Sequence, residues 1–327
     1  MSHKCNNVLL ILIYKLQLLR RKINLSSRKS YIYRRDQMKK FLGAYQNNHM
    51  HWVGDGFPVY NLFSYDRLGQ TLSPFLLLDY AAPYNFSPTT EQQGVGSHPH
   101  RGFETVTIAY QGEVTHKDSS GGGGTIKTGD VQWMTAGAGV LHEEFHSPEF
   151  AEHGGLFEMV QLWVNLPSHS KMTPGKYQAI EAKDIPDIAL DEHGSHLRVI
   201  AGEYADAKGA ATTFSPLNVW DGKLVKGQKH TLYVPEGHTT LVVVLEGAVV
   251  VNDTNRLEGK TVAILSREGV EFSLNAEEDT KFLVLTGQPL NEPIEGYGPF
   301  VMNTKAEIME AINDFNRGKF GSIMQEG

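Results

Sequence analysis

The segments His98-Pro99-His100-Arg101-Gly102-Phe103-Glu104 and Gly139-Val140-Leu141-His142-Glu143-Glu144 carry the pattern that decides both the fold and the site. Each segment holds two good metal ligands that are two positions apart. Because side chains alternate between the two faces of a β-strand, His98 and His100 would point the same way, and so would His142 and Glu144. The intervening chain is long enough for several short strands that return the second pair to the first.

Three imidazoles and one carboxylate on convergent strands would form a mixed nitrogen and oxygen site. Such a site suits a divalent transition metal and leaves positions open in an octahedral shell. A single His-x-His pair is a weak signal, because it also arises by chance or as a surface pair. Two such dyads in Gly-rich settings favour a metal site over polar residues at strand ends. We therefore predict His98, His100, His142 and Glu144 as metal ligands.

Composition limits the class of protein. The chain has 327 residues, which is enough for two domains, and 40% of them are hydrophobic. The net charge of −7 gives no reason to expect direct nucleic-acid binding. The only cysteine, Cys5, excludes an intrachain disulfide framework and indicates a reducing compartment, so we expect a cytoplasmic protein.

Residues 1–37 differ from the remainder because they are strongly basic and contain an apolar run from Val8 to Tyr14. The run is too short to span a bilayer, and no small-x-small cleavage motif follows it. Three interpretations stay open: a non-native upstream extension, a targeting or membrane-surface helix, or a packed helix. We favour the extension because Met38 opens a segment that would make a natural start.

The remaining chain has the pattern of a β protein. Alternating β-branched residues in Thr105–Tyr110 indicate a strand, and a second series of short apolar runs begins near Leu197. Such regular spacing favours a sandwich or a barrel. Gln111-Gly112 in the first half and Glu246-Gly247 in the second follow similar strands, which indicates a diverged internal duplication. We expect Glu246-Gly247 to form a hairpin turn. The second half lacks the ligand pattern, since His230 and His238 stand singly.

The end of the chain predicts a helix. Thr304 and Glu307 form a Thr-x-x-Glu capping box, and apolar residues follow at helical spacing from Ile308 to Phe315. Gly318 is placed to end the helix.

These motifs resemble those of the pirin family within the cupin superfamily. The resemblance covers about Val53 to Gly321 and rests on four segments: His98–Val106, Gly129–Gly137, Gln161–Pro167 and Gly298–Asn303. It implies an all-β fold of two face-to-face cupin (double-stranded β-helix, or jelly-roll) barrels with a short C-terminal helix. The implied organisation is a basic extension outside the fold (1–37), a metal-binding cupin domain (38–180), a metal-free cupin domain (181–303) and a helix that packs on the N-terminal half (304–327).

The resemblance also implies a function. Some pirins cleave the flavonol quercetin with O₂, so one hypothesis is a metal-dependent dioxygenase that acts on a flavonol or a similar enolisable aromatic substrate. The usual metal of the family is iron, which here would be Fe(II), although Ni, Cu, Mn or Zn also suit such ligands. The alternative is a redox-sensing, iron-binding regulatory protein that acts through a protein partner.

One predicted ligand has a second predicted role, and two further residues are candidates for a supporting role. Glu144 would take the proton of the substrate hydroxyl, because a general base must lie within hydrogen-bond reach of it. Glu104 and, more weakly, His116 are candidates to orient a ligand histidine from behind, although Glu104 could equally be a surface residue. We expect a monomer without a membrane role for the folded body.

Overall fold

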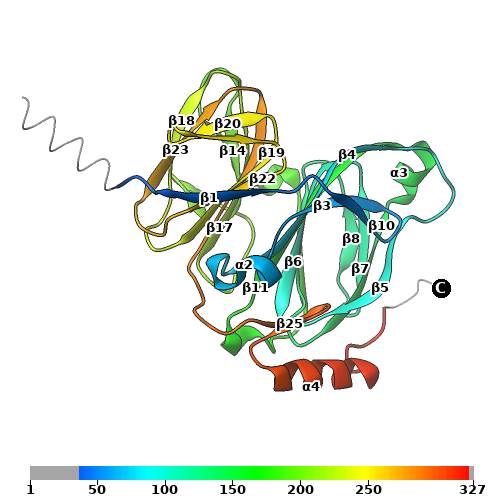
Figure 1. The fold of residues 1–327 in the computed structure, drawn as a ribbon. Helices are drawn as coiled ribbons and strands as arrows, with labels where there is room; N and C mark the ends of the chain where they lie inside the picture. Colours follow the sequence, from blue (N-terminus) through cyan, green and yellow to red (C-terminus); the bar gives the residue numbers. More distant parts are fainter. Residues whose placement is uncertain (1–36, 324–327) are drawn as a thin grey trace, which may run out of the picture.

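The computed structural model describes residues 37–323, and β-strands dominate it. Runs rich in β-branched and aromatic residues form these strands, because such side chains pack well on a pleated surface. The strands build two β-barrels that lie side by side, with one helix at the end of the chain (Figure 1). The predicted all-β architecture of two barrels with a short C-terminal helix is therefore confirmed.

The first barrel consists of a large sheet and a small sheet. The large sheet has the order β12 (Lys176–Ile180), β9 (Val131–Thr135), β6 (Phe103–Gln111), β11 (Gly155–Asn165), β4 (Phe75–Phe86), β3 (Phe57–Ser64) and β2 (Met50–Val53). The small sheet has the order β5 (Gly94–His100), β10 (Val140–His146), β7 (Val114–Asp118) and β8 (Gly123–Ile126). The histidines of the two segments thus lie on neighbouring strands of the small sheet, β5 and β10.

The second barrel repeats this division. Its large sheet has the order β1 (Phe41–Gln46), β22 (Thr261–Leu265), β19 (Thr239–Glu246), β24 (Thr280–Gly287), β17 (Leu217–Leu224), β14 (His196–Ala201) and β13 (Asp187–Ala189). Its small sheet has the order β18 (Lys229–Tyr233), β23 (Glu271–Ala276), β20 (Ala248–Val251) and β21 (Asn255–Glu258). Equal strand numbers in the corresponding sheets agree with an internal duplication.

A shared apolar core joins the two barrels. Val106, Ile108 and Leu162 of the first large sheet belong to one buried cluster with Val243 and Leu285 of the second. Alternation along β6 then requires its odd-numbered residues to point into the first barrel. The interior of the second barrel has its own apolar cluster, which includes Leu232, Phe272 and Phe282.

The glycines at Gly112 and Gly247 do not close hairpins. β6 and β7 flank Gly112 but lie in different sheets, and β19 and β20 flank Gly247 in the same way. Both glycines have positive φ, +79° and +82°, which a residue without a Cβ adopts readily. The predicted hairpin at Glu246-Gly247 is therefore wrong. The chain changes sheets there, because the strand before each glycine belongs to the large sheet and the strand after it belongs to the small sheet.

The boundary expected at residue 38 also needs correction. β1 pairs antiparallel with β22, so Phe41–Gln46 is an edge strand of the second barrel although it precedes the first in sequence. Alternation in this segment predicts a strand but does not specify which sheet it joins. The chain enters the first barrel at β2. The predictions for residues 1–36 lie outside the described residues.

The last helix, α4 (Lys305–Asn316), packs against β25 (Glu295–Tyr297) and β26 (Phe300–Met302) (Figure 1). Its Asp314 also reaches Arg101, the residue that follows β5 of the first barrel. The Thr304 hydroxyl accepts from the Glu307 backbone N–H, which is one half of the predicted capping box. The Glu307 carboxylate accepts from the backbone N–H of Asn303, one residue before the cap. Ile308 and Ala311 are buried beside Phe300 and Phe320. Within residues 37–323, no helix has the length and apolar character needed to cross a membrane.

Candidate metal centre

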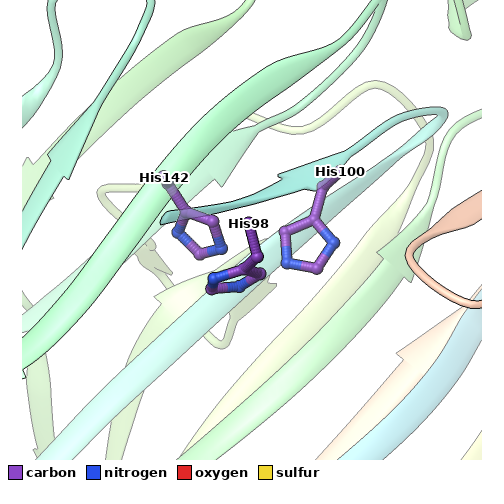
Figure 2. Close-up of side chains that lie close together, drawn as sticks. All are labelled: His98, His100 and His142. Carbon is purple, nitrogen blue, oxygen red and sulfur yellow. The ribbon is translucent and has the colours of Figure 1, made fainter. Parts of the chain in front are cut away.

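Strand pairing brings the two histidine segments together. β10 runs antiparallel to β5, with His142 directly opposite His98 and Val140 opposite His100. Each of the three histidines offers a ring nitrogen, and these atoms all lie within 4.8 Å of one another. Figure 2 shows the three rings turned toward a common point. The i, i+2 spacing of His98 and His100 therefore places both rings on one face, as expected.

The three imidazoles have the properties that metal ligands need. His142 is fully buried and His100 is 4% exposed, whereas His98 is half-buried. Burial and the neighbouring histidines lower the pKa of His100 and of His142 well below the ordinary value. Both rings are therefore neutral at pH 7, and a metal ligand must be deprotonated in this way.

An orphaned atom marks the centre of the group. His142 Nε2 is buried and has no hydrogen-bond partner among residues 37–323, which is costly unless a ligand satisfies it. The Nδ1 atom of His100 faces the carbonyl oxygen of Pro299 at 3.4 Å, so its Nε2 is the nitrogen left for a ligand. These residues fit a metal ion with nitrogen-rich coordination.

The fourth predicted ligand, Glu144, belongs to an overlapping group with His142 and His116. The β10–β5 register shifts between His142 and Glu144, so the carboxylate is displaced from His98 and His100. It accepts hydrogen bonds from Gln132 Nε2 at 2.6 Å and from Gln161 Nε2 at 3.0 Å. The structure thus groups three of the four predicted ligands and places Glu144 beside them. Its role as a ligand stays a prediction.

His116 lies directly behind His142. The Nδ1 atoms of the two rings are 3.4 Å apart, and His116 Nε2 is 3.1 Å from Asp118 Oδ2. The other oxygen of Asp118 accepts from the Ser120 hydroxyl and from the backbone N–H groups of Ser120 and Gly122. The predicted supporting role of His116 therefore has the geometry that it needs.

Glu104 has a different surrounding from the one expected. It is 1% exposed, and its carboxylate accepts a hydrogen bond from the Thr135 hydroxyl at 2.8 Å, not from a ligand histidine. Gly102, at φ +89°, separates β5 from β6, so alternation counted from His100 does not continue to Glu104. Thr107, which faces Glu144, points into the barrel, and the three-residue spacing puts Glu104 on the opposite face. Burial raises the pKa of Glu104 to about 7.

The end of the chain supports the ligand strands through contacts that the sequence did not reveal. Arg101 Nη2 is 3.0 Å from Asp314 Oδ2 on α4, and the Arg101 guanidinium lies over the Phe320 ring at 4.8 Å. The buried Lys171 ammonium donates to the carbonyl oxygens of Gly102 and Val301. One feature of the sequence could have indicated these contacts. Arg101 follows the ligand His100 directly, and a charged residue beside a buried ligand needs a partner of opposite charge.

Comparison with known proteins agrees with this architecture. Residues 56–164 match the model of the family described as Pirin, and residues 219–321 match that of the Pirin C-terminal cupin domain. A Pseudomonas aeruginosa protein named "Putative quercetin 2,3-dioxygenase" is 57% identical over 283 residues, which cover 86% of this chain and 99% of that protein. Human pirin is 37% identical over 257 residues, or 77% of this chain and 84% of that protein.

The fold also agrees with a solved structure. The quercetin 2,3-dioxygenase of Acinetobacter baumannii superposes with a TM-score of 0.78 at 25% sequence identity. The superposition covers 88% of this chain and 93% of that protein.

Proposed function

This chain belongs to the pirin family, and from that premise we propose that it is a metal-dependent dioxygenase that cleaves a flavonol such as quercetin with O₂. The observation that carries the proposal is the convergence of three histidine rings, two of them neutral through burial. One of their nitrogens, His142 Nε2, is buried without a hydrogen-bond partner in the described part of the chain. The names of similar proteins supply the reaction and substrate class. A regulatory role through a protein partner stays a prediction.

The three histidines and Glu144 would hold the metal, with Fe(II) proposed as the resident ion. When bound, such an ion supplies Lewis-acid and redox chemistry toward a substrate oxygen and O₂. His98, the half-buried member, lies where a substrate would approach, whereas His142 lies at the closed side.

Glu144 is positioned to accept the proton of the substrate hydroxyl. Two side-chain amides, from Gln132 and Gln161, donate to its oxygens and keep the carboxylate oriented. A general base must lie within hydrogen-bond reach of the proton that it takes, and an oriented carboxylate meets this need. Glu144 is 4% exposed, so bulk water has little access to it.

The proposal is tested by incubating the iron-loaded protein with quercetin, with and without O₂, and following the flavonol absorbance. The expected result is a loss of absorbance that needs both O₂ and protein, together with stoichiometric iron by elemental analysis. His100→Ala should lose both the metal and the activity, whereas His230→Ala, in the second barrel, should retain them. A fully iron-loaded protein that leaves quercetin intact in air would contradict the proposed reaction.

A further inference from the structure

A row of polar side chains crosses the inner face of the first barrel. Cross-strand register places its members opposite one another in the order Asn61 (β3), Asp79 (β4), Gln161 (β11), Thr107 (β6) and Gln132 (β9). Residues directly opposite on antiparallel strands share a face and lie within reach of each other. We call these five residues the polar row.

The polar row points into the barrel and lies one layer below the histidines. Gln161, Thr107 and Gln132 all hydrogen-bond to Glu144, which fixes the direction of the row. Two residues along β11 from Gln161, on the same face, Trp163 contacts the His100 ring with centroids 5.3 Å apart.

The opposite side of the row is apolar. Two residues along β3, β4, β11 and β6 in the other direction, the inward-facing side chains belong to one buried hydrophobic cluster: Val59, Ala81, Met159 and Ala109. The polar row is therefore a layer of polar side chains between the apolar end of the barrel interior and the metal centre.

Asp79 is the only ionisable member of the row. It is half-buried, as are its neighbours Asn61 and Gln161, whereas Thr107 and Gln132 are fully buried. Among the described residues, the one donor to its carboxylate is Asn61 Nδ2, which is 2.9 Å from Oδ1. Its other oxygen, Oδ2, has no hydrogen bond within the described part of the chain and is reached by solvent.

The electrostatic state of Asp79 agrees with a carboxylate that lacks donors. Burial raises its pKa above the ordinary value, and the hydrogen bond from Asn61 and the charge of His51 oppose this only in part. A hydroxyl donor at Oδ2 would stabilise the ionised form. The other charged group that the row contacts is Glu144, at the far end, and it already has three donors.

We propose that Asp79 is a substrate-binding residue, whose Oδ2 accepts a hydrogen bond from a ring hydroxyl of the aromatic substrate other than the hydroxyl held at the histidines. This inference rests on the proposed function and assigns the polar end of the substrate to the β3–β4 side of the barrel. Asp79 would then favour polyhydroxylated rings over rings without hydroxyls, because a ligand that covers Oδ2 without donating to it removes solvent from the carboxylate and returns no hydrogen bond.

The test compares two flavonols that share the group for the metal and differ in their other hydroxyls. Binding of quercetin and of 3-hydroxyflavone to the metal-loaded protein is measured without O₂, by quenching of tryptophan fluorescence. Asp79→Ala should reduce the preference for quercetin by about tenfold, the size of one charge-assisted hydrogen bond. Asp79→Asn keeps the shape and the Asn61 contact, and should reduce it by a smaller factor, about threefold.

The control is Asp187→Ala, which removes a carboxylate from β13 of the second barrel and should leave both affinities unchanged. If Asp79→Ala misfolds or loses metal, Asp79→Asn decides. Equal weakening of both flavonols, or no change, would overturn the role of Asp79 and leave the proposed reaction standing. A wild-type protein that binds neither flavonol would overturn the proposed substrate class and this role with it.

Discussion

The Nδ1 atoms of His142 and His116 lie 3.4 Å apart, and this pair fixes which nitrogen of His142 faces the metal position. Asp118 accepts from His116 Nε2–H, so the Nδ1 of a neutral His116 carries a lone pair. That lone pair can accept from a proton on His142 Nδ1 at 3.4 Å, and the Gln132 amide at 3.5 Å is the second donor within its reach. His142 Nε2, the buried atom without a partner, is then left with a free lone pair for a metal.

Replacement of His116 by Phe should therefore weaken metal binding while leaving all the predicted ligands in place. Without an acceptor, the His142 proton is no longer held on Nδ1, and the ring loses the contact that orients it. Loss of such a supporting partner costs about 10- to 100-fold in metal affinity. Competition with a chromophoric chelator measures this directly.

The matched control is His230→Phe in the second barrel, where His230 Nε2 pairs with Asp191 Oδ2 at 2.8 Å. It removes the same kind of His–Asp pair far from the ligands. The metal affinity measured by chelator competition should therefore stay unchanged. Equal metal affinity in His116→Phe and in the wild type would show that His142 holds its tautomer without His116.

The local pattern of the chain predicted the ligand strands well, because alternation is a property of consecutive residues. His98 and His100 share a face since no irregularity separates them, and the antiparallel return of β10 sets His142 opposite His98. Glu104 was misplaced for the complementary reason. The turn at Gly102 interrupts the alternation, and the effect of a glycine on strand direction is not visible from spacing alone.

The partners of Glu144 could not be predicted from the sequence. Gln132 and Gln161 are uncharged, lie on different strands and meet the carboxylate only through the register of β9 and β11 with β6. The position of β1 in the second barrel was hidden for a similar reason. Its alternation specifies a half-buried strand but not the sheet that covers it.

Glu104 should make the free energy of unfolding fall as pH rises. Its folded-state pKa is about 7, against an ordinary value of 4.5, so the folded protein holds the extra proton between these values. Stability from this group is complete below pH 4.5 and is lost as pH rises through about 7, with a total change of about 3 kcal/mol. Glu104→Gln should remove this dependence and be the more stable protein at pH 8.

Urea unfolding of both proteins at pH 5.5 and at pH 8 measures the difference, and other titrating groups cancel because they are common to both. Glu152→Gln, an exposed replacement, provides the control and should show no pH-dependent difference. A difference between Glu104→Gln and the wild type that is the same at both pH values would be inconsistent with a raised pKa.

Asp314→Asn should loosen α4 from the first barrel. The Arg101 side chain is 4% exposed and would keep its charge without a counter-charge, which is costly at a buried position. Hydrogen exchange of the peptide that covers α4 should accelerate by about tenfold, and metal affinity should fall because Arg101 follows the ligand His100. Asp253→Asn, which removes the exposed partner of Lys229, should leave both quantities unchanged.

Removal of the metal should destabilise the first barrel. His98, His100 and His142 gather their nitrogens within 4.8 Å, and the ion stabilises the folded state by mass action, by about 4 kcal/mol when free metal is a thousandfold above the dissociation constant. Chelator-treated protein should then melt roughly 5 to 10 °C below the metal-loaded protein in differential scanning fluorimetry. His100→Ala should melt at the same temperature with and without added Fe(II), because the binding group is broken. A wild-type protein whose melting temperature ignores both chelator and metal would mean that these three rings hold no ion.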